Sequence, residues 1–158
     1  MMGAGATGPQ GLFLDELSVG QRFASGRVTV GEAEIKEFAG AYDPQPFHLD
    51  EEAARASLFG GLAASGWHTA ALTMRLLVDG GLPLAGGIIG ASGELAWPRP
   101  VRPGDVLRVE SEVLAVKPSR SRADRGLATV RSTTLNQKGE PVQVFTMQLV
   151  VLRRTSPA

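Results

Sequence analysis

Residues 66–78 read GWHTAALTMRLLV, and Arg75 is the only charged residue in this segment. Nearly every side chain from Trp67 to Val78 is apolar, so the sequence predicts a helix without a clear polar face. A helix that is apolar almost all round is expected to be buried. We therefore predict a central helix that the rest of the chain surrounds, with Trp67 and Trp97 in the core.

The segments on either side of this helix differ in their periodicity. Residues 31–42 have apolar side chains at helical spacing, and the prolines that follow end this helix near Asp43. Asp50 is predicted to cap a second short helix over residues 51–58. After the central helix, apolar and polar residues alternate, which is typical of strands. The predicted strands are residues 88–89, 94–97, 106–113, 127–136 and 142–152, with a hairpin turn at 137–140. This order favours an α+β fold in which an antiparallel sheet wraps around the central helix.

The length of 158 residues fits one domain with tails. We predict a flexible, Gly-rich N-terminal tail over residues 1–11, a single domain over 12–154 and a C-terminal tail over 155–158. No stretch approaches the roughly 20 apolar residues of a membrane span. The start also lacks the charged segment of a secretory signal, so a cytoplasmic location is expected.

The composition excludes several classes of chemistry. The 16 Lys and Arg balance the 16 Asp and Glu, which argues against a nucleic-acid-binding protein. Without cysteine there is no disulfide, thiol nucleophile or thiolate metal site, and 2 histidines argue against a zinc site built from imidazoles. The chemistry must therefore come from carboxylates, hydroxyls, the two histidines and the backbone.

Residues 43–50, DPQPFHLD, form the densest polar constellation in the chain. Two prolines restrict the backbone between Asp43 and His48, so both side chains can be held toward one point. A carboxylate and an imidazole that grip one water form a general acid/base pair. The alternative is an Asx turn at Asp43 and a histidine packed at a loop edge, and this segment alone leaves it open.

The start of the central helix is a second candidate element. A helix N-terminus presents unpaired N–H groups and a partial positive charge. Gly66 at this position would let a substrate carbonyl approach the backbone closely, as in an oxyanion site. Alternatively, Gly66 only allows tight packing and Ser65 only caps the helix.

Taken together, these segments resemble a known family. Residues 38–50 (FAGAYDPQPFHLD), 59–61 (FGG) and 64–66 (ASG) resemble the hydratase motif of MaoC-like dehydratases, which include the (R)-specific enoyl-CoA hydratases. Residues 100–105 (PVRPGD) resemble the Pro-Val…Gly-Asp turn of that family, and the resemblance covers residues 13–153. It implies the hotdog fold, a sheet wrapped around one long helix, and a homodimer or larger homo-oligomer.

The resemblance also implies roles for individual residues. Asp43 and His48 match the catalytic Asp and His, and Gly66 matches the glycine whose N–H holds the thioester carbonyl. The implied reaction is reversible hydration of a trans-2-enoyl thioester to a 3-hydroxyacyl thioester. Coenzyme A would enter as part of an acyl-CoA substrate, with no metal and no separate cofactor.

Some positions depart from the family pattern. Gln45 stands where the family usually has Asn, and Ser65 where it commonly has His. Both are predicted to lie near the thioester, so they are candidate substrate-binding residues. Tyr42 and His68 are two further candidates, each with a purely structural role as the alternative.

Residues 117–125, KPSRSRADR, contain the only basic cluster. Arg120 and Arg122 are candidates for binding the phosphates of coenzyme A, because a guanidinium makes bidentate contacts to phosphate. The alternative is a solvated loop between strands.

Two other functions compete with hydration and dehydration. A hotdog thioesterase would release free coenzyme A, and a non-catalytic acyl-thioester-binding subunit would bind without turnover. The spacing of Asp43 and His48 favours the hydratase over the thioesterase, and an intact set of Asp43, His48 and Gly66 argues against a binding subunit.

Overall fold

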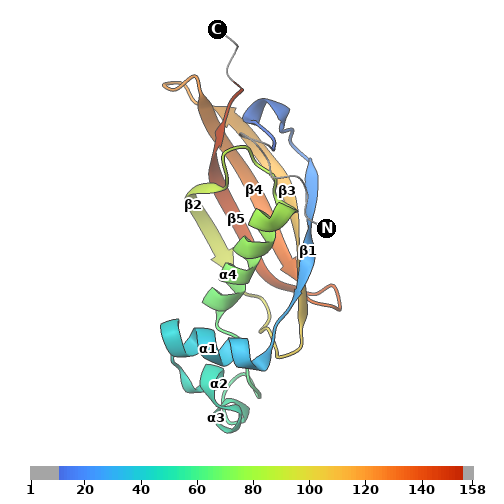
Figure 1. The fold of residues 1–158 in the computed structure, drawn as a ribbon, viewed down its shortest axis with the longest axis vertical. Helices are drawn as coiled ribbons and strands as arrows, with labels where there is room; N and C mark the ends of the chain where they lie inside the picture. The colour runs from blue at the N-terminus through green and yellow to red at the C-terminus, as the bar shows by residue number, and fades with distance from the viewer. Residues whose placement is uncertain (1–10, 155–158) are drawn as a thin grey trace.

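The core of the fold is an antiparallel sheet of five strands, seen behind helix α4 in the computed structural model (Figure 1). The structure describes residues 11–154, so the predicted tails, apart from Gly11, lie outside the described residues. The strands are β1 (Arg22–Thr29), β2 (Ile89–Ala96), β3 (Val106–Pro118), β4 (Arg125–Leu135) and β5 (Pro141–Leu152). Their order across the sheet is β1-β3-β4-β5-β2, which leaves β1 and β2 at the edges.

The helices lie along one face and at both ends of the sheet. They are η1 (Leu14–Glu16), α1 (Glu32–Tyr42), α2 (Pro46–Leu49), α3 (Glu51–Arg55), α4 (Gly66–Leu76) and the π-helical turn η2 (Leu77–Gly81). Helix α4 lies along the sheet, and α1, α2 and α3 lie at the end where α4 begins (Figure 1). The predicted α+β architecture is confirmed. Among the described residues, no helix is long and apolar enough to cross a membrane.

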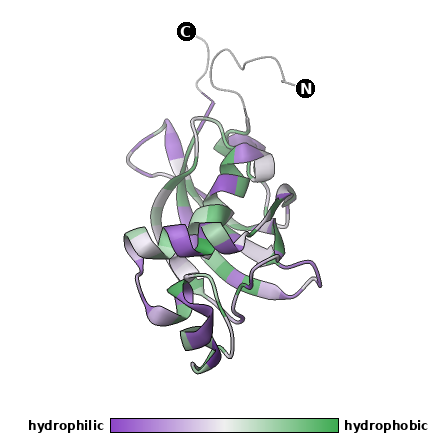
Figure 2. Ribbon diagram, turned by 60° about the horizontal axis from the view of Figure 1, so that its bottom comes forward, coloured by the Kyte–Doolittle hydropathy of each residue, from purple (hydrophilic) through white to green (hydrophobic). Residues whose placement is uncertain are grey.

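Two clusters of buried apolar side chains hold these layers together. The first fills the space between the sheet and α4 with η2, and includes Leu77, Val109, Val113, Val130 and Leu149. The second joins α1 and α3 to the end of the sheet, and includes Ile35, Ala54, Leu62, Leu107 and Val142. Hydrophobic and hydrophilic residues alternate along the long strands (Figure 2), and alternate residues of β3, β4 and β5 are buried in this core. Each fully buried aliphatic side chain contributes about 1.5–3 kcal/mol.

Helix α4 is buried on one side only, which corrects the expectation that it is surrounded. Thr69, Thr73 and Leu76 face the sheet, whereas Trp67 is 60% exposed. Trp97 is 41% exposed, so neither tryptophan belongs to the core of this chain. The physical reason is that the sheet is open and covers α4 from one face.

Several local boundaries differ from the sequence prediction: the helix predicted over residues 51–58 ends at Arg55, and the strands predicted at 88–89 and 94–97 form the single strand β2. Asp50 caps α3 as predicted, and its carboxylate accepts a hydrogen bond from the Ala53 N–H at 3.2 Å. The hairpin turn at residues 137–140 joins β4 to β5 as predicted. The single turn α2 was not predicted. Pro46 occupies its first position, where a missing N–H costs nothing, so the proline that cannot continue α1 starts a new helical turn.

Candidate functional site

Asp43 and His48 meet at the end of the molecule where α1, α2 and α4 come together. Asp43 ends α1, and its N–H donates to the Ala39 carbonyl at 2.8 Å. The α2 turn then places His48 beside it, with Nε2 3.3 Å from Asp43 Oδ2. The two side chains are 16% and 5% exposed. The structure therefore brings together the two groups that the sequence motif singles out.

The orientation of His48 is set by its backbone partner. His48 Nδ1 lies 2.6 Å from the carbonyl oxygen of Ala63, and a carbonyl only accepts, so Nδ1 carries the hydrogen. Nε2 consequently points at Asp43. The rings of Phe47 and Phe59 lie 4.6 Å and 6.1 Å from the imidazole and hold it from the sides.

The Asp43 carboxylate accepts two further hydrogen bonds. Ser65 Oγ donates to Oδ2 at 2.7 Å, and Gln45 Nε2 donates to Oδ1 at 2.5 Å. Burial raises the pKa of the Asp43 carboxyl, but the hydrogen bonds from Ser65 and Gln45 and the neighbouring His48 outweigh burial, so the net pKa is lowered. The carboxylate is therefore held in its ionised form, which a base requires.

The N-terminus of α4 lies beside this pair. Ser65 caps the helix by accepting the Trp67 N–H at 3.2 Å. The Gly66 N–H has no acceptor within the part of the chain that the structure describes. A Cβ at Gly66 would lie 2.6 Å from Cε2 of the Trp97 ring, so no side chain fits there. The free N–H at a helix N-terminus is suited to an oxygen with partial negative charge.

A cavity of ≈ 450 Å³ connects these groups. Asp43, Gln45, His48 and Gly66 line it on the polar side. The apolar side includes the rings of Phe47, Phe59, Trp67 and Trp97. Polar groups that converge in a mostly apolar cavity suit a ligand with an apolar chain and one reactive polar end.

Several lining residues were not predicted as site residues. Trp97, Arg99 and Phe59 line the cavity, and Arg99 also pairs with Glu140 at 3.4 Å. Trp97 lies there because the strand β2 ends beside the start of α4, although Gly66 and Trp97 are far apart in the sequence. Local periodicity carries no signal for such a contact.

Tyr42 and His68, two of the candidate substrate-binding residues, lie elsewhere. They line a separate depression with Glu34, Glu37 and Phe38. Tyr42 is 76% exposed, and His68 is buried and stacked on Phe38 with 4.7 Å between ring centroids. Neither side chain lines the cavity at Asp43.

Arg120 and Arg122 also lie far from the cavity within one protomer. Both belong to the loop between β3 and β4, at the end of the sheet opposite α1, α2 and α3 (Figure 1). The Arg122 N–H donates to Ser119 Oγ at 3.1 Å. A single copy of the chain therefore does not bring these guanidinium groups to Asp43.

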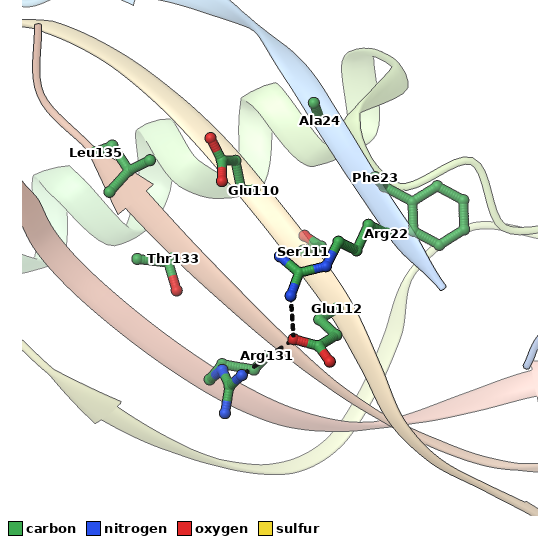
Figure 3. Close-up of a pocket in the computed structure, with 9 residues that line it drawn as sticks. All are labelled: Arg22, Phe23, Ala24, Glu110, Ser111, Glu112, Arg131, Thr133 and Leu135. Atoms are coloured by element: carbon green, nitrogen blue, oxygen red, sulfur yellow. Dashed lines mark hydrogen bonds and ion pairs between the residues drawn. The ribbon is translucent and has the colours of Figure 1, made fainter. Parts of the chain in front are cut away.

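The outer face of the sheet has a second depression, of ≈ 390 Å³ (Figure 3). Glu112 lines it and pairs with Arg22 at 3.4 Å and with Arg131 at 3.2 Å. These charges largely neutralise one another and tie β1, β3 and β4 together. Among residues 11–154 there is no group of three or more His, Cys, Asp or Glu placed to hold a metal ion.

Comparison with known proteins places the chain in a family. The model of the MaoC like domain matches residues 16–136. The chain belongs to the MaoC-like family. Two curated relatives are similar to this MaoC-like protein over most of its length. YdeM of Bacillus subtilis is 38% identical over 140 residues, which cover 88% of this chain and 96% of YdeM. The 3-hydroxybutyryl-CoA dehydratase of Methylorubrum extorquens is 36% identical over 118 residues, which cover 71% of this chain and 70% of the dehydratase.

A solved structure confirms the fold of the MaoC-like protein. The crystal structure of the MaoC-like dehydratase from Rhodospirillum rubrum superimposes with a TM-score of 0.91 at 67% identity, and covers 92% of this chain and 100% of its own. The hotdog fold and the family resemblance inferred from the sequence motifs are thus confirmed. The roles of Asp43, His48 and Gly66 remain predictions of the motif and of the geometry described above.

Proposed function

We propose that this MaoC-like protein adds water to trans-2-enoyl thioesters of coenzyme A and removes it from the corresponding 3-hydroxyacyl thioesters. The observation that carries the proposal is the convergence of Asp43 Oδ2 and His48 Nε2, 3.3 Å apart, on a cavity that Gly66 also lines. Family membership and the similarity to a 3-hydroxybutyryl-CoA dehydratase support the same chemistry.

In the hydration direction, the nucleophile is a water within reach of both Asp43 and His48. A carboxylate oxygen accepts a hydrogen bond, and so does Nε2 of an imidazole whose hydrogen is on Nδ1, so both atoms can accept from one water. Asp43 takes one proton from this water, and the water oxygen bonds to the β-carbon of the enoyl group. The π electrons move onto the α-carbon and the thioester oxygen. General acid/base assistance of this kind contributes about 10²–10⁴-fold in rate.

The negative charge on the thioester oxygen is stabilised at the start of α4. The Gly66 N–H donates to this oxygen, and the helix dipole has its positive end there. One such donor contributes about 3 kcal/mol to transition-state stabilisation. The α-carbon then takes a proton from the Asp43–His48 pair, so one water is added and the pair returns to its starting state.

The edge strand β2 supports a homodimer. It pairs with β5 on one side only, and nearly all of its residues are exposed. An apolar groove lined by Met74, Phe145 and Met147 runs beside it. Because an unpaired edge next to an apolar surface favours pairing with another chain, we propose that β2 pairs antiparallel with β2 of a second copy.

In this two-fold arrangement, the basic β3–β4 loop of one copy can contribute to substrate binding in the other copy. Rotation about an axis normal to the sheet turns the second copy end over end, so its β3–β4 loop lies near the α1–α3 end of the first. Arg120 and Arg122 of one copy would then approach the cavity of the other, where guanidinium groups can hold the phosphates of coenzyme A.

A substrate screen tests the proposed reaction. The protein is incubated with short, medium, long and branched trans-2-enoyl-CoA, and the loss of enoyl absorbance and the release of free thiol are followed in parallel. We expect the enoyl signal to fall without free thiol, with a 3-hydroxyacyl-CoA as product. Free thiol with the double bond intact would identify a thioesterase, and binding without either change would identify a non-catalytic binding subunit; both outcomes overturn the proposal.

A further inference from the structure

The Ser65 hydroxyl forms hydrogen bonds both to the Asp43 carboxylate and to the start of α4. Its Oγ donates to Asp43 Oδ2 at 2.7 Å and accepts the Trp67 N–H at 3.2 Å. Ser65 is 0% exposed and does not line the cavity. A hydroxyl has one hydrogen to donate and lone pairs to accept, so these two bonds use its hydrogen and leave none for a substrate.

We propose that Ser65 is a positioning residue that acts through Asp43. Its hydroxyl favours the ionised form of the Asp43 carboxylate and holds that carboxylate at a set place relative to the Gly66 N–H. This assignment replaces the expectation that Ser65 binds substrate, and it rests on the proposed function for its catalytic consequence. The hydrogen bond from Ser65 favours the charged form of Asp43, and this effect can be tested in the free protein without substrate.

In the described part of the chain, no other polar or charged group near Asp43 replaces the hydrogen bond that Ser65 donates to Oδ2. His48 on α2 contacts the carboxylate directly, and Arg99 lines the same cavity from the segment after β2. Tyr42 of α1 and His68 of α4 line the separate depression. Gln45 donates to the other oxygen, Oδ1, so it cannot replace the Ser65 donor at Oδ2.

The capping role of Ser65 must be separated from its effect on Asp43. Loss of a helix cap lowers the stability of the whole protein and leaves the titration of a distant carboxyl unchanged. Ser57 provides a matched control, because its Oγ donates to the Ala54 carbonyl at 2.5 Å and accepts the Phe59 N–H at 3.1 Å without contacting Asp43.

The experiment compares Ser65→Ala, Ser65→Thr and Ser57→Ala with the wild type. The Asp43 carboxyl carbon is titrated by NMR in the free protein, with its signal assigned from Asp43→Asn, and the pH profile of kcat/KM is measured on an enoyl-CoA. In Ser65→Ala we expect the Asp43 titration and the acid limb of the profile to move together to higher pH. The ratio of the rate at low pH to that at neutral pH should fall about tenfold.

Ser65→Thr keeps the hydroxyl and should restore both readouts, while Ser57→Ala should lower the melting temperature and leave the Asp43 titration in place. An unchanged Asp43 titration in Ser65→Ala would overturn the proposal and leave Ser65 as a cap only. If Ser65→Ala does not fold, Ser65→Cys fills the same space with a weak donor and is titrated instead. A wild type without hydratase activity would refute the proposed function, whereas the NMR titration would still decide the role of Ser65.

Discussion

Gly66 shows how tightly one residue is constrained in this site. Its N–H is free within the described residues, and the ring of Trp97 covers the space that a Cβ would need. The nearest ring atom would lie 2.6 Å from that Cβ, well inside van der Waals contact. The glycine is therefore required for close packing of the indole on the helix start, as well as for access to the backbone.

Gly66→Ala should displace Trp97 or the start of α4 and so move the N–H that we assign to the thioester oxygen. A displacement of about 1 Å at a reacting centre can cost on the order of 100-fold in rate. We therefore expect kcat for hydration to fall by roughly this factor. Steady-state kinetics on an enoyl-CoA measure it.

Gly40→Ala is the matched control for this substitution. Gly40 lies in α1 and is exposed, and no neighbouring atom lies within 4 Å of the place that an alanine Cβ would take. Alanine there should raise the free energy of unfolding by about 0.5–1 kcal/mol and leave kcat unchanged. Equal kcat values for Gly66→Ala and the wild type would show that the N–H position does not matter.

At the scale of residues, the sequence predicts contacts that are close along the chain. Asp43 and His48 are five positions apart, and the intervening prolines restrict the backbone, so their meeting follows from the motif. The hydrogen bond from Ser65 to Asp43 spans 22 positions, and the packing of Trp97 on Gly66 spans a whole helix and strand. Such contacts depend on how the elements pack, which local patterns do not encode.

At the scale of elements, the packing of α1 on α4 contains a buried histidine. His68 is 6% exposed, and its Nδ1 has no hydrogen-bond partner among residues 11–154. Burial lowers the pKa of the His68 imidazole, and the nearby Glu34 offsets this only in part. The folded protein therefore binds a proton at His68 less readily than the unfolded chain does.

This difference predicts a pH dependence of stability. Because the pKa in the folded state lies below the ordinary value of about 6.5, the contribution of His68 is fully present above that value. It is lost as the pH falls through the unfolded and then the folded pKa. We expect the free energy of unfolding to decrease from about pH 8 to about pH 5, and His68→Phe, which keeps an aromatic ring against Phe38, to reduce that decrease.

Denaturant titrations of both proteins at the two pH values measure this difference. The wild type should lose more stability on acidification than His68→Phe. Parallel losses in the two proteins would place the acid sensitivity elsewhere, for example at Asp43.

The sequence predicted the strands and the helix cap better than it predicted which side of α4 is buried. Alternation along β3, β4 and β5 and the cap at Asp50 are local properties, and the structure confirms them. The outward side of the segment formed by α4 and η2 carries Trp67 and Val78, which are as apolar as the buried side. Composition therefore could not show which side the sheet covers. Trp67, on this exposed side, also lines the cavity.

At the scale of the whole molecule, we expect dimerisation through β2. A lysine on an edge strand opposes pairing with another chain, because its charge would have to be buried. Ile89→Lys should therefore convert the dimer to a monomer in sedimentation experiments, since Ile89 is 46% exposed on β2. Val19→Lys, at a site that is 68% exposed and remote from β2, should remain dimeric. A dimeric Ile89→Lys protein would place the interface elsewhere.

The dimer also links the basic loop to substrate binding. Arg120→Glu combined with Arg122→Glu should raise KM for an enoyl-CoA, because phosphates would then meet carboxylates, and should leave kcat unchanged. An enoyl thioester of N-acetylcysteamine lacks the phosphates and serves as the control substrate, with an unchanged KM. An equal change for both substrates would contradict a role for this loop in phosphate binding.

The hydration rate of a short trans-2-enoyl-CoA, compared between the wild type and Asp43→Asn, decides whether the Asp43 carboxylate is the base. Asparagine keeps the shape of the side chain and an oxygen that can accept from Ser65, but it cannot take a proton from water. We expect kcat to fall by about 10²–10⁴-fold while the protein stays folded. A folded Asp43→Asn protein that hydrates the substrate as fast as the wild type would contradict the proposed mechanism.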